Sequence, residues 1–128
     1  MSKSSIADQL VQITLSAPDA EATTVTGTGI DIKDFDGSIK ITQLVGTITG
    51  GSSPTLNGKI QDSDEQGSNF VDVPGAVFAE VDTSDTDLSI SLSTRSVKRF
   101  IRYVGTIAGS PTSIDMAASA VGIHQLST

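Results

Sequence analysis

Short apolar segments with a period of two recur along this chain, and clusters of turn-forming residues separate them about every eight to twelve residues. Residues 11–15 (VQITL) and 88–92 (LSISL) alternate apolar and polar side chains, which is typical of a strand with one buried face. Further β-branched segments follow at 30–32, 97–107 and 114–123, and no apolar stripe has a helical period. The pattern predicts an all-β fold, an antiparallel β-sandwich of about eight to ten short strands with a Greek-key or jelly-roll arrangement.

Turn signals predict where the strands end. Asp36-Gly37 is a strong two-residue hairpin signal, because both positions favour a positive φ. We expect it to join a strand at 30–35 to one at 38–49. Three further clusters of Gly, Pro, Ser and Asp are expected to end strands, at residues 16–19, 50–54 and 74–75.

One segment is repeated. Residues 44–50 (LVGTITG) are echoed by residues 103–109 (YVGTIAG), and each copy is followed by a turn that contains Ser and Pro. The repeat predicts two hairpins in equivalent places, one in each sheet, with Gly46 and Gly105 at a bulge or tight bend. Two copies are too few for a solenoid.

Composition and charge exclude several classes of function. The chain of 128 residues has the length of one domain, and it contains no cysteine, so disulfides, thiolate catalysis and the usual zinc and iron–sulfur sites are absent. No apolar run approaches the ~20 residues of a membrane helix, and the first residues do not resemble an export signal. A net charge of −7 disfavours nucleic acid and anionic membranes as partners. We expect folding in a reducing cytoplasm.

The residues do not predict catalysis or a cofactor. His124 is the single histidine, and no Gly-x-Ser-x-Gly elbow precedes a helix. Residues 27–29 (GTG) are not followed by a predicted helix. A phosphate-binding loop needs the N-terminus of such a helix, so these glycines do not indicate one. A thin sandwich also leaves little room for a pocket. We therefore expect a non-enzymatic protein.

The loop at residues 62–67 (DSDEQG) begins like a calcium loop, with oxygen-bearing side chains at alternate positions and Gly sixth. Position twelve, where an EF-hand supplies a bidentate Glu, is Val73. The preferred interpretation is a hairpin loop whose side chains bind its own backbone, with no metal ligands.

The basic residues are concentrated in one place. Four of the eight Lys and Arg residues are Arg95, Lys98, Arg99 and Arg102. On an extended strand, Lys98 and Arg102 share one face and Arg99 lies on the other. Two interpretations stay open: an edge strand whose charges prevent aggregation, or a patch that docks on an acidic partner, including residues 82–87 of a neighbouring copy.

The first nine residues are expected to form a polar arm, and residues 10–128 a single β-sandwich domain. Ser2, Lys3 and Ile6 are candidate partner contacts in this arm, because a polar segment can become ordered on binding and add a strand to a neighbour.

Two segments resemble a known family. Small proteins encoded near the capsid genes of tailed bacteriophages contain two motifs that this chain resembles in the order and spacing of residues. The similar segments are residues 96–104 (SVKRFIRYV) and 59–76 (KIQDSDEQGSNFVDVPGA). The similarity covers about residues 30–121 of the chain, with the loop slightly longer at residues 65–67, where the family has Asp-Gly.

The resemblance implies a virion structural protein, a capsid decoration (cement) protein that binds the major capsid protein on the outside of an icosahedral head. It implies a homodimer or homotrimer made in the host cytoplasm, with no catalytic residues. The alternatives are a carbohydrate-binding or structural module of a tail or head fibre, and a tail or baseplate subunit. A sugar site is disfavoured because exposed aromatic residues are scarce.

Overall fold

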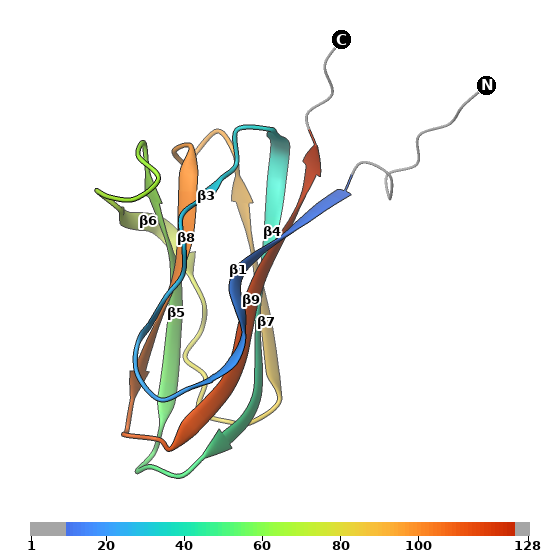
Figure 1. Ribbon diagram of the computed structural model, residues 1–128. Helices are drawn as coiled ribbons and strands as arrows, with labels where there is room; N and C mark the ends of the chain where they lie inside the picture. The colour runs from blue at the N-terminus through green and yellow to red at the C-terminus, as the bar shows by residue number, and fades with distance from the viewer. Residues whose placement is uncertain (1–9, 125–128) are drawn as a thin grey trace, which may run out of the picture.

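A computed structural model describes residues 10–124 as two antiparallel sheets packed face to face (Figure 1). One sheet has the order β1 (Leu10–Glu21), β9 (Ser113–His124), β4 (Phe35–Thr49) and β7 (Thr86–Ser93). The other has the order β2 (Val25–Thr26), β8 (Phe100–Ala108), β5 (Thr55–Ser63) and β6 (Val71–Val77), and β3 (Ile30–Asp31) also pairs with β8. The predicted β-sandwich is confirmed. The described residues include no helix long and apolar enough to cross a membrane.

The strand order is that of a jelly roll. If β2 and β3 are taken as one interrupted strand, the first strand pairs with the last, the second with the second-last, and so inward to the hairpin of β5 and β6. The chain is thus one long antiparallel hairpin rolled into two sheets, and the pairs β4·β9 and β5·β8 complete the sheets. The sequence did not distinguish a jelly roll from other Greek-key arrangements, and the observed strand pairing is that of a jelly roll.

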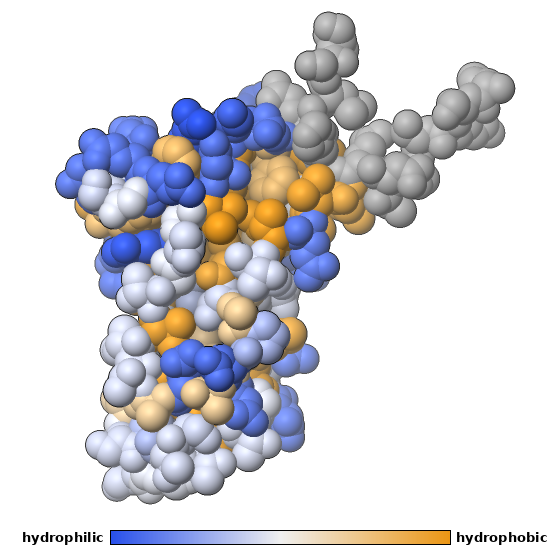
Figure 2. Space-filling model, viewed as in Figure 1, coloured by the Kyte–Doolittle hydropathy of each residue, from blue (hydrophilic) through white to orange (hydrophobic). Residues whose placement is uncertain are grey.

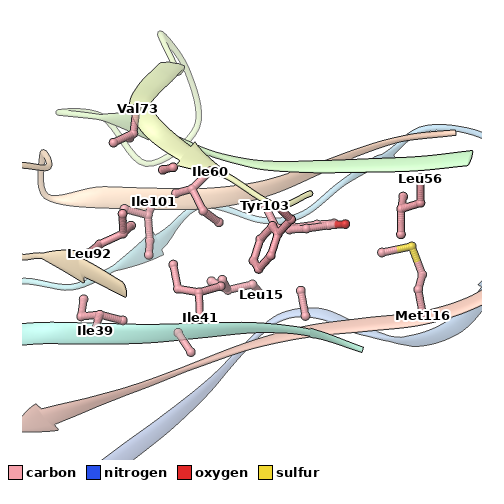
Figure 3. Packing of buried hydrophobic residues seen from close by; sticks show 14 of the residues in the cluster. Leu15, Ile39, Ile41, Leu56, Ile60, Val73, Leu92, Ile101, Tyr103 and Met116 are labelled. Carbon is pink, nitrogen blue, oxygen red and sulfur yellow. The ribbon is translucent and has the colours of Figure 1, made fainter. Parts of the chain in front are cut away.

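Period-two patterning builds the core. On β4, Ile39 and Ile41 are fully buried while Lys40 between them is exposed. Figure 3 shows these side chains facing Ile60 and Ile101 of the opposite sheet, with Tyr103 in the space between the layers. Aliphatic residues supply most of this core, and Phe35, Phe78, Phe100, Tyr103 and Met116 supply the rest.

The predicted hairpin at Asp36-Gly37 is wrong. β4 runs through both residues, and a register shift lies between Asp36 and Ile39 in its pairing with β9. Gly37 has φ = +82°, so its left-handed conformation serves a β-bulge instead of a turn. The preceding residues Ile30 and Asp31 pair with β8 in the other sheet, and the chain therefore crosses between sheets here.

Two prolines do not end strands as expected. Pro18 lies inside β1, and Pro74-Gly75 lies inside β6. Both strands are edge strands with register shifts next to the proline, where the missing N–H costs no ladder bond. Residues 50–54 do form the expected connection between strands.

The repeated segments occupy equivalent places, β4 in one sheet and β8 in the other, so their predicted placement in different sheets is confirmed. The predicted hairpins are wrong. After β4 the chain crosses to β5 in the other sheet, and after β8 it crosses back to β9. The two connections are bonded to each other: Ser52 N–H donates to Gly109 O and Thr112 N–H to Thr49 O, both at 2.8 Å. Gly46 lies at a register shift, as predicted, whereas Gly105 pairs in continuous register.

Candidate interaction surfaces

The basic cluster is divided by the fold. β8 lies in the interior of its sheet between β2 and β5, so the interpretation of residues 95–102 as a protective edge strand is wrong. Arg99 makes a bidentate ion pair with Asp31 on β3, with Nη2 2.8 Å from Oδ2 and Nε 3.2 Å from Oδ1. Its guanidinium also lies 4.9 Å from the ring centroid of Phe100. Arg99 therefore fastens β3 to the start of β8.

Arg102 has a structural role on the outer face of the same sheet. Its Nε donates to Gln61 Oε1 at 2.9 Å, and its guanidinium lies 4.3 Å from the centroid of Phe70. Gln61 Nε2 in turn donates to Asp72 at 2.8 Å, and Lys59 Nζ lies 2.9 Å from the same carboxylate. This row of polar side chains crosses β8, β5 and β6.

The ion pair with Arg99 holds the pKa of Asp31 below its ordinary value of 3.8, chiefly through the side-chain hydrogen bond. The hydrogen bonds from Gln61 and Lys59 likewise lower the pKa of Asp72. A lowered carboxylate pKa stabilises the fold above about pH 4, and this contribution is lost as the pH falls through the folded-state value. Both carboxylates are solvent-accessible, so the contribution is small.

Arg95 and Lys98 are the exposed members of the cluster whose charges are not paired among the described residues. They lie in the connection between β7 and β8, and neither side chain has a hydrogen-bond or ion-pair partner within the part of the chain that is described. The backbone N–H of Lys98 donates to the buried carboxylate of Asp62 at 2.9 Å, which holds the connection in place. Their charges are thus available to a partner.

The calcium-like loop binds its own backbone. Ser63 Oγ donates to Ser68 O at 2.6 Å and accepts from Glu65 N–H at 2.9 Å, while Glu65 Oε2 accepts from Ser68 and Asn69. Within residues 10–124, no group of three or more His, Cys, Asp or Glu side chains has a metal-binding arrangement.

Calcium should therefore not bind to this loop. Asp62 is committed to Lys98 N–H, and Glu65 to its neighbours, so too few oxygens remain for the six to eight ligands of Ca²⁺. We expect a calorimetric titration of the protein with calcium chloride to show only heats of dilution. A saturable exothermic or endothermic transition that Asp64→Asn abolishes would contradict this interpretation.

An acidic surface lies at the opposite end of β7. Asp82, Asp85 and Asp87 are exposed there, and the Asp85 backbone N–H donates to Gly46 O at 2.8 Å. The acidic segment and the basic connection are therefore separated by the whole length of β7 within one molecule.

A shallow, mainly apolar groove of about 480 Å³ lies on the outer face of the sheet that contains β1, β9 and β4. Its lining residues are Pro18, Asp19, Ala20, Leu44, Gly46, Asp115, Met116 and Ala117. Its two ionisable lining residues, Asp19 and Asp115, are both exposed, and the other lining residues are apolar or Gly, so its geometry suits contact with an apolar side chain.

Apolar residues are also exposed where β1 begins. Leu10 and Ile123 are paired neighbours on β1 and β9, and 45% and 39% of their surfaces are exposed. Figure 2 shows orange residues in this upper part of the molecule, whereas the lower end is mostly pale. Ser2, Lys3 and Ile6 lie outside the described residues, and the predicted arm is thus not placed.

A buried polar pair was not foreseen from the sequence. The hydroxyl of Tyr103 on β8 donates to Gln43 Oε1 on β4, and both residues are fully buried. Among the described residues, Gln43 Nε2 has no hydrogen-bond partner. Burial raises the pKa of Tyr103, so the phenol stays a neutral donor across the usual pH range. This bond joins the two sheets through the core.

Comparisons with known proteins show the fold. Neither a scan against protein-family models nor a search of curated proteins gave a match. Solved structures with similar folds include a chain of infectious bursal disease virus, Gx strain (20% identity, TM-score 0.54), and one of the VP2 subviral particle of that virus (15%, TM-score 0.56). Each match covers 90% of this chain but only 32% of the viral chain.

A third similar structure comes from Bacillus endospore appendages, described as disulfide-linked pili. It is 11% identical with a TM-score of 0.51, and the match covers 98% of both chains. At these identities the comparisons establish a shared jelly-roll sandwich. This fold occurs in subunits of a virus particle and of a spore filament.

Proposed function

We propose that this chain is a virion structural protein, a decoration protein that binds the outside of an assembled head and stabilises contacts between major capsid subunits. The observation that carries the proposal is the jelly-roll sandwich, which matches subunits of a virus particle over 90% of this chain. The resemblance of residues 59–76 and 96–104 to phage proteins encoded near capsid genes supports the narrower role.

The surface suits adhesion. The described polar clusters are bound within the fold, as Arg99 is to Asp31, or are exposed charges at the two ends of β7. A rigid unit of this kind can bind a symmetric shell weakly at each contact, because many copies act together and each bound copy stabilises only the assembled state. Under this proposal the chain performs no catalysis, and its partners are the major capsid protein and other copies of itself.

The test is cosedimentation of the purified chain with heads built from the major capsid protein encoded beside it. We expect saturable binding and a rise in the melting temperature of the shell. Deleting residues 2–9 should weaken binding at least about tenfold, if the arm with Ser2, Lys3 and Ile6 adds a strand to a neighbouring subunit. Replacing Lys3 and Ile6 by Ser provides a matched variant of unchanged length. Binding that is equal for all three proteins would assign the contact to the folded domain.

A second candidate function is a filament subunit, because the match to the endospore appendage protein covers 98% of both chains. This chain has no cysteine, so such a filament would lack disulfide links. Fibres of concentrated protein in negative-stain micrographs, with no binding to heads, would favour it. The carbohydrate-binding alternative is weakened by the complete burial of Tyr103, since a sugar-stacking ring must be exposed.

A further inference from the structure

The edges of the two sheets differ in how they are protected against pairing with another strand. β1 carries Pro18 and two register shifts, and β6 carries Pro74-Gly75 in a bulge. β2 and β3 are two residues long each. These are the usual devices that prevent edge-to-edge association. Among the described strands at sheet edges, β7 alone lacks them.

β7 is a regular, uncharged edge over most of its length. It pairs with β4 through eight consecutive residues with no register shift, and it contains no Pro, Lys or Arg. Its outward side chains are Asp87 and three serines, all exposed. Its core-facing Leu88 and Ile90 are only half-buried, so a strand added beside β7 would cover them further. An edge of this kind favours strand addition.

The charges at the two ends of β7 indicate which strand pairs with it. The N-terminal end is flanked by Asp82 and Asp85, and the C-terminal end by Arg95 and Lys98. Eight strand residues span roughly 26 Å, which exceeds the Debye length of roughly 8 Å at physiological salt, so these ends cannot neutralise each other within one molecule. An antiparallel copy of the same strand would place each acidic end beside a basic end.

We propose that β7 strands of two copies pair antiparallel across a twofold axis near Ile90, which joins their two sheets into one continuous sheet. In this register the turn with Asp82 and Asp85 lies at the same end of the paired strands as the connection of the second copy that carries Arg95 and Lys98. Asp87 faces Ser93 and is diagonal to Arg95, so no like charges are opposed. Pairing covers the β7 edge of both copies. Neither copy then has an unprotected edge for a third, so the assembly is a closed dimer.

This inference does not depend on binding to a capsid, and it is tested on the isolated full-length chain. Two charge-reversed proteins are compared: one carries Arg95→Glu and Lys98→Glu, and the other carries Asp82→Lys and Asp87→Lys. Asp85 is left unchanged because its φ of +60° disfavours a long side chain. All four altered side chains are exposed, so each protein should keep its fold.

Sedimentation velocity should show a dimer of twice 13.2 kDa for the natural sequence. Each charge-reversed protein alone has two like-charged ends and should dimerise at least about tenfold more weakly. An equimolar mixture of the two restores opposite charges at both ends, and it should form a heterodimer. A natural protein that is monomeric at about 1 mM, homodimers of unchanged affinity, or a mixture that stays monomeric would each overturn the proposal.

A second pair of variants tests the strand itself. Ser89→Lys with Ser91→Lys places lysines opposite each other across the axis, and it should abolish the dimer. The matched control, Gln12→Lys with Thr14→Lys, adds two lysines to exposed positions on β1, the other edge of the same sheet, and it should leave the dimer intact. Equal effects of both pairs would assign the contact elsewhere. Amide protection of β7 that rises with protein concentration gives the same test without substitutions.

Discussion

Gly58→Ala should lower the free energy of unfolding by about 3 kcal/mol, near the upper end of the cost of overpacking a well-packed core. A Cβ at this position would overlap Gln43 Oε1, and it would lie 2.8 Å from the Tyr103 hydroxyl and 2.9 Å from a ring carbon. Neither neighbour can retreat, because both are fully buried between the sheets. The substitution therefore breaks the hydrogen bond that joins β4 to β8.

Urea unfolding followed by circular dichroism measures this effect. Gly67→Ala is the matched control, because a Cβ there meets no atom within 4 Å and its φ is not in the left-handed region. We expect the control to lie within about 0.5 kcal/mol of the natural protein. If both alanine variants had the same stability, the close packing of the Tyr103 ring on Gly58 would be contradicted.

Tyr103→Ala is the second substitution with a large expected effect, a loss of about 4 kcal/mol, as for other buried aromatic residues. The Tyr103 ring packs edge-to-face on Phe78 with centroids 6.2 Å apart, and it also covers Gly58 and Gly105. Tyr103→Phe keeps these contacts and removes the hydroxyl. It should cost about 1–3 kcal/mol, because Gln43 would then have no partner for either amide atom.

A double-mutant cycle isolates the hydrogen bond. Gln43→Leu alone leaves the buried Tyr103 hydroxyl without an acceptor, and Tyr103→Phe alone leaves the amide without a donor. The double variant removes both polar groups, so it should be at least as stable as either single variant. Strictly additive losses, with the double variant the least stable of the four proteins, would show that the two side chains do not interact.

The alternation of apolar and polar residues was enough to predict the sandwich. On β7, Leu88, Ile90 and Leu92 face the core as their spacing indicates. The hairpin at Asp36-Gly37 was predicted wrongly because a left-handed glycine occurs in a β-bulge as well as in a hairpin turn. The pairing of Ile30 and Asp31 with β8 shows that the bulge is the one formed here. Local sequence does not contain that long-range choice.

The interaction surfaces were only partly predictable. The basic cluster was visible in the sequence, but the partner of Arg99 is 68 residues away, so its structural role required the fold. Gln43 could have been found: it follows Ile39 and Ile41 at the same parity, which places it on the buried face of β4. The unprotected edge of β7 became apparent only when the order of strands was known.

The central claim is that this jelly roll acts by adhering to a larger assembly. An electron-microscopy map of particles produced with this chain, compared with particles that lack it, tests the claim most directly. We predict additional density on the outer surface of the shell that fits the two packed sheets of residues 10–124. Particles whose outer surface is identical with and without the chain would contradict the account.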